Sequence, residues 1–182
     1  LGSGVRAILI YPMNALANDQ LKRLRQLLKD YPEITFGRYT GETKERKSEA
    51  ADYFRKMNPK QEILSNELLS REEMRENPPH ILLTNYAMLE YLLLRPNDNV
   101  FFDGAYKDEW KFVVLDEAHV YAGSLGSEIS YLLARLKDRV ADGEKNKLQF
   151  IATSATLGGS KKEISDVIRY AEDLFDEKFT ED

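Results

Sequence analysis

Short apolar segments alternate with amphipathic segments along the chain, and this alternation constrains the fold more than any other feature of the sequence. The apolar segments are rich in branched residues, as strands buried on both faces of a sheet are. The segments between them carry hydrophobic residues at helical spacing. Strands that alternate with helices of this length predict an α/β fold, with a parallel sheet covered by helices on both faces. We expect strands at 5–11, 34–39, 80–84, 111–115 and 148–152, and helices at 15–30, 86–94 and 127–140.

Local signals predict where further elements begin. Asn14 is expected to cap the helix after the first strand, because its side-chain oxygen can accept a hydrogen bond from a free backbone N–H. A turn precedes a second helix that is expected to begin near Thr43. Ser70 and Glu73 have the spacing of a capping box, in which each residue bonds the backbone of the other. Ser160 is expected to cap the last helix.

The segment 43–79 is dense in charges of both signs and interrupts the strand and helix pattern. It predicts an inserted helical elaboration of the sheet. Mixed charge is mostly a sign of solvation, so a solvated helical surface is the preferred interpretation. A contact with a partner or with nucleic acid is the alternative.

Length and composition narrow the class of protein. The 182 residues suit one domain with a core of its own. A net charge of −5 gives no general attraction to nucleic acid, so any such contact must be local. The absence of cysteine excludes a disulfide and a thiolate zinc site, which suits a reducing compartment, and we expect a cytoplasmic protein. The longest apolar stretch, 81–94, is interrupted by polar residues, so no membrane span is expected.

An apolar strand that ends in two adjacent carboxylates is the strongest chemical signal. Asp116 and Glu117 directly follow the segment Phe-Val-Val-Leu, and His119 lies two residues further on. Open α/β sheets bind ligands at the carboxyl ends of their strands. In a phosphate-transfer site the first carboxylate can hold a magnesium ion, and the second can orient or deprotonate the attacking water. The alternative is an ordinary helix start, which also favours Asp and Glu.

A cluster of small hydroxyl side chains follows the next expected strand. It consists of Thr153, Ser154 and Thr156 around one alanine. A neighbouring parallel strand would bring these hydroxyls beside the acids, where they can hydrogen-bond His119 or the carboxylates. The alternative is a cluster that caps a helix or forms a turn, since Ser and Thr are frequent at such positions.

These strings resemble the motifs of superfamily 2 helicases. Asp-Glu-Ala-His at 116–119 and Ser-Ala-Thr at 154–156 resemble motifs II and III. Tyr-Pro-Met-Asn-Ala-Leu-Ala-Asn-Asp-Gln at 11–20 is similar to motif Ia, Thr-Gly-Glu at 40–42 to the small turn that follows it, and Thr-Asn at 84–85 to motif Ib. The motifs stand in family order on the expected strands, and the resemblance covers nearly the whole chain.

The resemblance implies a fold and a function. It implies a RecA-like sheet of the P-loop NTPase type, incomplete at its N-terminal side. Residues 1–182 would form part of the N-terminal RecA-like ATP-binding domain of an ATP-dependent helicase or translocase, with the charged insertion at about 43–79. Such a motor couples ATP hydrolysis to movement on nucleic acid, and DNA rather than RNA is the expected partner.

The resemblance also implies residue roles. Asp116 would hold Mg²⁺, and Glu117 would be the catalytic base for water. His119, Ser154 and Thr156 would link the state of the nucleotide to movement. An exposed helix start presents free N–H groups that suit a phosphate whatever the overall charge. Contacts to the nucleic-acid backbone are expected from Pro12, Asn14, Thr40, Gly41, Thr84 and Asn85.

The sequence departs from the family pattern in one respect. It contains no G-x-x-x-x-G-K-[ST] string, whose backbone amides and lysine cradle the phosphates of ATP. The second RecA-like domain and its arginine finger are also missing. We therefore expect the fragment by itself to be inactive, and to work with a second RecA-like domain of the same chain. The strings around motifs Ia and Ib resemble bacterial RecQ-four-like DNA helicases.

Two other functions stay open from the sequence. A small metallohydrolase would use Glu117, His119 and His80 as metal ligands, although His80 is more typical of a residue at a strand edge. A catalytically degenerate helicase-like domain would serve only as a binding platform. Base stacking by exposed aromatic residues is the weaker interpretation, and core packing is expected for Tyr86, Tyr91, Phe101, Phe102 and Trp110.

Overall fold

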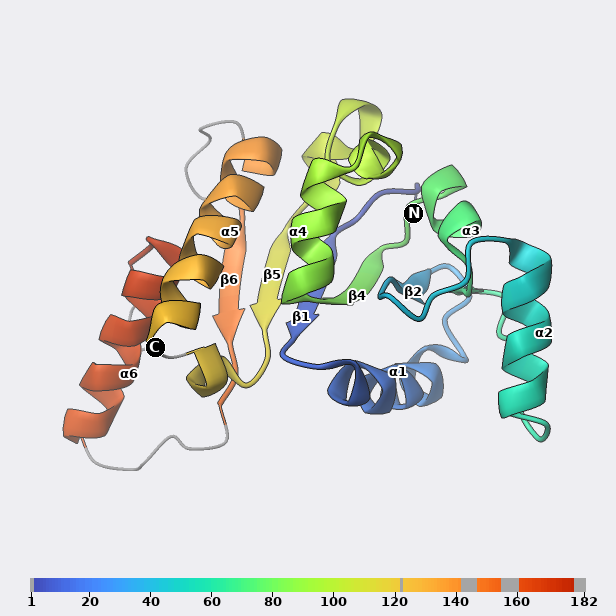
Figure 1. Cartoon of the computed structure of the whole chain (residues 1–182), viewed down its shortest axis with the longest axis horizontal. Coiled ribbons are helices and arrows are strands. Elements are labelled where there is room, and N and C mark those ends of the chain that lie inside the picture. Colours follow the sequence, from blue (N-terminus) through green and yellow to red (C-terminus); the bar gives the residue numbers. More distant parts are fainter. Residues whose placement is uncertain (1, 122, 142–146, 155–160, 179–182) are drawn as a thin grey trace.

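A single parallel sheet of six strands organises the chain (Figure 1). The computed structural model describes residues 2–121, 123–141, 147–154 and 161–178. The strand order is β3-β2-β4-β1-β5-β6, and all neighbouring strands in it pair in parallel. The strands are β1 (Ala7–Tyr11), β2 (Phe36–Arg38), β3 (Glu67–Leu68), β4 (Ile81–Asn85), β5 (Phe112–Leu115) and β6 (Gln149–Ala152). The predicted α/β fold with a parallel sheet is therefore confirmed.

The described residues form six α-helices and three short 3₁₀ helices, which lie between the strands except for the last helix, α6, which follows β6. The α-helices are α1 (Asn14–Leu28), α2 (Lys47–Met57), α3 (Arg71–Glu76), α4 (Tyr86–Leu94), α5 (Ser124–Ala141) and α6 (Lys161–Phe175). The 3₁₀ helices are η1 (Pro96–Phe101), η2 (Gly104–Glu109) and η3 (Ala118–Tyr121). Within the described residues, no helix is long and apolar enough to span a bilayer.

The two faces of the sheet are covered by different helices. On one face α4, α5 and the end of α6 pack against buried strand residues such as Ile8, Leu82 and Val113. On the other face α1 packs through Ala17 against Leu83. Apolar residues alternate between these two cores along β1 and β4, because successive side chains of a strand point to opposite faces.

The sheet is incompletely covered at β5 and β6. Phe112 and Ile151 are each 39% exposed, although both belong to strands. β6 pairs only with β5 among the described residues, so its other edge carries unpaired backbone groups. Exposed apolar side chains beside an open edge are a feature that folded proteins usually cover.

The charged segment 43–79 is more closely joined to the sheet than the sequence predicts. It contains α2 and α3 as expected, but it also contributes β3, which pairs with β2. The helix expected near Thr43 begins at Lys47. Glu67 of β3 is buried and forms an ion pair with Arg25 of α1.

Other local expectations have mixed outcomes. Asn14 does not cap α1: it is the first helical residue, and the cap position Met13 makes no side-chain cap bond. Ser160 lies outside the described residues. Phe101, Phe102 and Trp110 are fully buried and Tyr86 packs against the core, as expected. The expectation is wrong for Tyr91, which is 53% exposed because it lies on the outer side of α4 under the guanidinium of Arg95.

The capping box at the start of α3 is confirmed. The Ser70 hydroxyl accepts from the backbone N–H of Glu73 at 3.1 Å, and the Glu73 carboxylate accepts from the backbone N–H of Ser70 at 3.2 Å. Both bonds satisfy donors that a helix end would otherwise leave free. The helix has only six residues, and the fully buried side chain of Met74 also anchors it in the core.

We predict that Ser70→Ala lowers the free energy of unfolding by about 1 kcal/mol, the usual cost of removing an N-cap hydroxyl. Ser48→Ala is the matched control, because Ser48 lies exposed in the first turn of α2 and should change stability by less than about 0.5 kcal/mol. Urea denaturation of both variants measures the difference. Equal stabilities of the two variants would contradict the capping role.

Candidate functional site

The two adjacent acids lie at the carboxyl end of β5, which runs between β1 and β6. The backbone N–H of Asp116 donates to the carbonyl of Ile10 at 2.9 Å, which extends the pairing with β1 by one residue. Glu117 then takes a left-handed backbone conformation with φ of 53°. This turn ends the strand and starts η3, so the two carboxylates are displayed at the edge of the sheet where ligands of open α/β sheets bind.

Thr153, the residue after β6, holds the turn that carries the acids. Its hydroxyl donates to a carboxylate oxygen of Asp116 and accepts from the backbone N–H of Glu117 at 3.3 Å. Its carbonyl accepts from the backbone N–H of Ala118 at 2.8 Å. Three contacts from one residue fix the acids relative to the neighbouring strand.

His119 connects the second acid to the hydroxyl cluster. Its Nδ1 lies 3.0 Å from the hydroxyl of Ser154 and 3.3 Å from a carboxylate oxygen of Glu117. The expectation that these hydroxyls bond His119 or a carboxylate is confirmed for Thr153 and Ser154. Thr156 lies outside the described residues.

Two buried tyrosines lie in the electrostatic field of Asp116. Burial, and then the negative charge of Asp116, raise the pKa of Tyr11 and of Tyr121 well above the usual range of a phenol. Both phenols are therefore neutral at physiological pH. The hydroxyl of Tyr121 has no hydrogen-bond partner among the described residues, and its ring packs edge-on against Tyr86 at 6.1 Å between centroids.

The acid cluster suits a metal ion that is shared with a ligand. The described residues contain no group of three or more His, Cys, Asp or Glu side chains that could hold a metal by themselves. Mg²⁺ typically binds through one or two carboxylates together with waters and substrate phosphates, so Asp116 beside the Thr153 hydroxyl fits this ion.

The same finding weakens the metallohydrolase alternative. His80 is buried and has a structural role: its Nδ1 accepts from the backbone N–H of Thr35 at 2.9 Å, and its Nε2 lies 2.8 Å from the carbonyl of Gly2. It therefore has hydrogen-bond partners at both ring nitrogens and is not part of a metal cluster.

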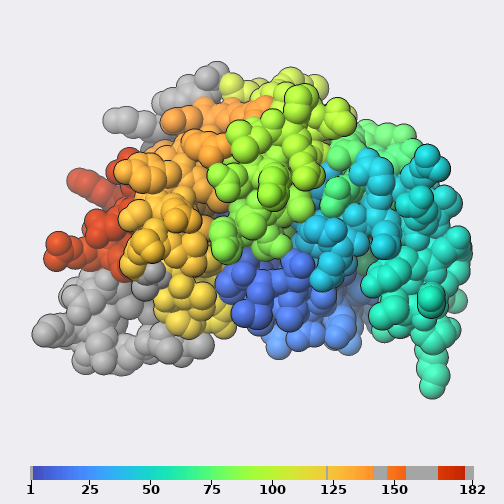
Figure 2. Space-filling model, in the orientation of Figure 1, coloured from blue at the N-terminus to red at the C-terminus, as the bar shows by residue number. Residues whose placement is uncertain are grey.

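A second group of candidate residues gathers where β1, β2 and β4 end. The Asn85 side-chain amide donates to the Asn14 oxygen at 2.6 Å, and the Asn14 amide lies 3.3 Å from a Glu42 carboxylate oxygen. Asn85 also accepts from the backbone N–H of Met88, so it caps α4. In the space-filling view, the blue N-terminal part of the chain borders the green part of the chain on the surface shown (Figure 2).

The start of α1 is the open helix end in this group. Pro12 precedes it and is partly exposed, and the helix has neither a side-chain cap nor an acidic residue in its first turn. The first backbone N–H groups of a helix lack partners within the helix, and they carry a partial positive charge. This end can therefore accept an anion such as a phosphate.

The remaining residues that were expected to contact nucleic acid include both exposed and buried ones. Gly41 is exposed at the turn. Thr40 and Thr84 are fully buried, which differs from the expectation of direct contact with nucleic acid. The Thr84 hydroxyl donates to the carbonyl of Tyr39 at 2.8 Å, and so it ties β4 to the residue before the turn. Both threonines support this surface from beneath.

Two residues of these clusters were not singled out from the sequence. Thr153 was seen only as part of a hydroxyl-rich string, and its three contacts depend on the pairing of β5 with β6. Arg38, at the end of β2, bonds Asn18 and pairs with Glu42 at 2.9 Å. The Arg38 guanidinium lowers the pKa of Glu42, so this carboxylate stays charged on the surface. No short motif signals such a residue.

We predict that Glu117→Gly is more stable than Glu117→Ala by about 1 kcal/mol, because only glycine adopts a positive φ without steric cost. At Glu128, an exposed position in α5, the order should reverse by about 1 kcal/mol, because glycine is the poorer helix residue. Urea denaturation of the four variants provides the measurement. Greater stability of the alanine variant at both positions would show that Glu117 is unstrained.

Comparison with known proteins agrees with this arrangement of motifs. The family model described as DEAD/DEAH box helicase matches residues 1–164. The Druantia protein DruE of Escherichia coli is 32% identical over 254 aligned residues, which cover 94% of this chain and 14% of DruE. An uncharacterized ATP-dependent helicase of Methanocaldococcus jannaschii, MJ1574, is 30% identical over 86% of this chain and 20% of its own length.

Solved structures of the DUF1998 helicase MrfA share the fold. MrfA bound to DNA has a TM-score of 0.67 at 24% identity, and MrfA bound to DNA and AMPPNP has a TM-score of 0.63 at 25% identity. Each comparison covers 97% of this chain and 20% of the MrfA chain. The chain thus spans one fifth or less of these relatives. With a RecA-like sheet and the family match over most of its length, the chain belongs to the DEAD/DEAH box helicase family.

Proposed function

We propose that this chain is the ATP-coupling part of a DNA helicase or translocase, and that it hydrolyses ATP when the rest of the motor is present. One observation carries this proposal. Asp116 and Glu117 lie at the carboxyl end of an inner parallel strand, and the hydroxyls of Thr153 and Ser154 bond the turn that displays them. Relatives that carry helicase in their names match most of the chain.

The geometry supports distinct roles for the two acids. Asp116 would hold Mg²⁺, because its carboxylate is fixed by Thr153 and lies at the ligand-binding edge of the sheet. A bound magnesium ion would neutralise charge that develops on the phosphates of ATP. Glu117 would orient and deprotonate the attacking water, and its side chain is 30% exposed and so can reach a ligand.

His119 and Ser154 would transmit the state of the site. Nδ1 of His119 contacts both the Glu117 carboxylate and the Ser154 hydroxyl, so a change at the acid alters the hydrogen bond to the segment after β6. Thr156 would belong to the same segment.

The nucleic-acid surface would consist of the open start of α1, Gly41 and the amide side chains of Asn14 and Asn85. Backbone N–H groups and neutral amides bind phosphates without a basic surface, which suits a chain with a net charge of −5. DNA is the proposed nucleic acid, because MrfA is a DNA-bound helicase in its solved structures. Thr40, Thr84 and Pro12 would hold the backbone of this surface in place.

The rest of the motor would complete the sheet. The open edge of β6 and the exposed side chains of Phe112 and Ile151 suit a further strand and helix of the same protein. We propose that this segment carries the phosphate-binding loop that the present sequence lacks, and that a second RecA-like domain closes on the acids. Within the family, the strings at residues 11–20 and 82–96 support a RecQ-four-like DNA helicase.

In the full-length protein, Glu117→Gln should lower DNA-stimulated ATP hydrolysis by about 100-fold or more, because general base catalysis contributes about that much. Binding of ATP and of DNA should persist. Glu128→Gln, which removes the same charge from the surface of α5, is the control and should leave the rate unchanged. Equal rates of hydrolysis by the Glu117→Gln and unaltered proteins would contradict the catalytic role of Glu117. Sustained ATP hydrolysis by the 182 residues alone would contradict the proposal that a further segment supplies the phosphate-binding loop.

Asn14→Ala should weaken the binding of single-stranded DNA about 5-fold, which corresponds to the loss of about one hydrogen bond. The change removes the side chain that joins Asn85 to Glu42. Gln26→Ala is the control, because Gln26 is exposed near the other end of α1. Fluorescence anisotropy with a labelled oligonucleotide measures both affinities, and equal affinities would exclude Asn14 from the DNA surface.

A further inference from the structure

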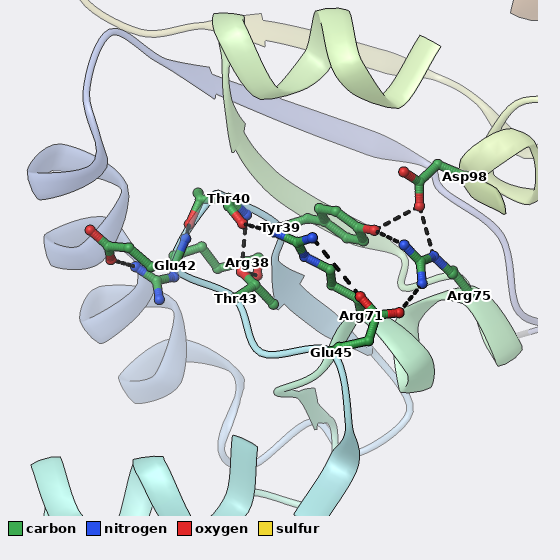
Figure 3. A network of polar contacts seen from close by, with 9 residues as sticks. All are labelled: Arg38, Tyr39, Thr40, Glu42, Thr43, Glu45, Arg71, Arg75 and Asp98. Atoms are coloured by element: carbon green, nitrogen blue, oxygen red, sulfur yellow. Dashed lines mark hydrogen bonds and ion pairs between the residues drawn. The ribbon is translucent and has the colours of Figure 1, made fainter. Parts of the chain in front are cut away.

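Helix α3 of the charged insertion reaches the turn at 40–42 through Arg71. The guanidinium of Arg71 donates to the backbone carbonyl of Thr40 at 3.0 Å (Figure 3). It also lies 5.3 Å from the centre of the Tyr39 ring and 3.9 Å from a carboxylate oxygen of Glu45. Its side chain is only 17% exposed. Arg71 thus touches the backbone of the turn from the protein side.

A buried hydrogen-bond network fixes the residue just before the turn. The hydroxyl of Tyr39 donates to a carboxylate oxygen of Asp98 at 2.6 Å, and both residues are fully buried. Arg75 of α3 donates to the same oxygen at 2.8 Å and to the Tyr39 hydroxyl at 2.7 Å, and it also pairs with Glu45 (Figure 3). The network joins β2, α3 and η1 around one tyrosine.

The turn also has internal bonds that depend on its shape. The hydroxyl of Thr43 accepts from the backbone N–H of Thr40 at 2.9 Å and donates to the carbonyl of Arg38 at 2.7 Å. The backbone N–H of Thr43 donates to the carbonyl of Thr40 at 3.2 Å. The Thr40 carbonyl therefore accepts one bond from within the turn and one from Arg71.

We propose that Arg71 is a positioning residue for DNA binding, and that α3 of the charged insertion holds the 40–42 turn in the conformation that presents Gly41 to the DNA backbone. This inference rests on the proposed function. It changes the interpretation of the insertion from a solvated surface to a support for the DNA surface. Arg75 and Asp98 fix Tyr39, and Arg71 holds the carbonyl of Thr40.

The local charges favour support over direct phosphate binding. Glu45 lies beside both arginines, and Asp98 accepts from Arg75, so two carboxylates accompany two guanidinium groups. Arg71 is mostly buried, bonded to a backbone carbonyl and faced by the carboxylate of Glu45, so it is poorly placed to contact a phosphate. Removal of Arg71 should therefore weaken DNA binding without changing how binding depends on salt.

Arg71→Gln should reduce the affinity of the chain for labelled single-stranded DNA about 5- to 10-fold. The slope of log Kd against log salt concentration should stay the same, because each lost phosphate contact changes that slope by about 0.7 for single strands. Arg71→Lys should not restore the affinity, because an ammonium group lacks the planar fork of arginine. Arg55→Gln, which removes an exposed charge paired with Asp52 on α2, is the matched control and should bind as the unaltered chain does.

Hydrogen exchange of the backbone amides at 40–43 gives a readout that does not involve DNA. In Arg71→Gln these amides should exchange faster, while those of β1 and β4 keep their rates. Unchanged affinity, full rescue by lysine, a reduced salt slope or an unchanged exchange rate in the turn would each overturn the positioning role. If the unaltered chain fails to bind DNA, the proposed function fails instead, and the exchange rates still decide whether Arg71 holds the turn.

Discussion

The parallel pairing of β1, β4 and β5 is the constraint on which the rest of the structure depends. Parallel strands all end at the same edge of a sheet, so segments far apart in the sequence are brought together there. Tyr11 and Asn85 are register partners at the ends of β1 and β4, and Leu115, the partner of Ile10, is followed directly by Asp116. The two candidate clusters are therefore consequences of one arrangement: the acids follow β5, and the amides of Asn14 and Asn85 follow or end the neighbouring strands. No long-range electrostatic attraction is needed to assemble them, because the backbone hydrogen bonds of the sheet already do so.

The turn that carries Asp116 and Glu117 shows how the chain stabilises a strained backbone conformation. A left-handed backbone at Glu117 costs free energy for a residue with a side chain, and such a conformation persists when surrounding contacts determine it. Thr153 supplies these contacts through its hydroxyl and its carbonyl, so β6 fixes the direction in which the acids point. The strained residue thus follows β5, and the residue that stabilises it follows β6, a strand that is adjacent to β5 only in the folded protein.

Much of the fold could be predicted from the sequence, because buried parallel strands and amphipathic helices have distinct periodicities. The apolar run before Asp116 is the clearest case, and α4 begins and ends as expected at Tyr86 and Leu94. The sequence did not reveal β3, because two residues are too few to show a strand periodicity. It also did not reveal the burial of Thr40 and Thr84, because a threonine hydroxyl can face solvent or can bond a backbone carbonyl in the interior. Arg71 was missed for a related reason. In a segment rich in both charges, composition indicates solvation, and only the folded structure shows which arginine meets a buried partner.

Under the proposed function, the position of both clusters on one sheet limits how ATP hydrolysis would be coupled to movement. Asp116 is hydrogen-bonded through its backbone to Ile10 of β1, and Tyr121, which follows the acids, packs against Tyr86, which follows Asn85. Packed interiors of this kind do not deform continuously, so the acids and the proposed DNA surface cannot move far apart within this domain. We infer that the moving part lies outside the sheet. A second domain that contacts the acids in one state of the nucleotide, and the DNA in both, would change its position relative to this rigid surface. Under this inference, His119 and Ser154 matter because they lie at the exposed edge that such a domain would meet.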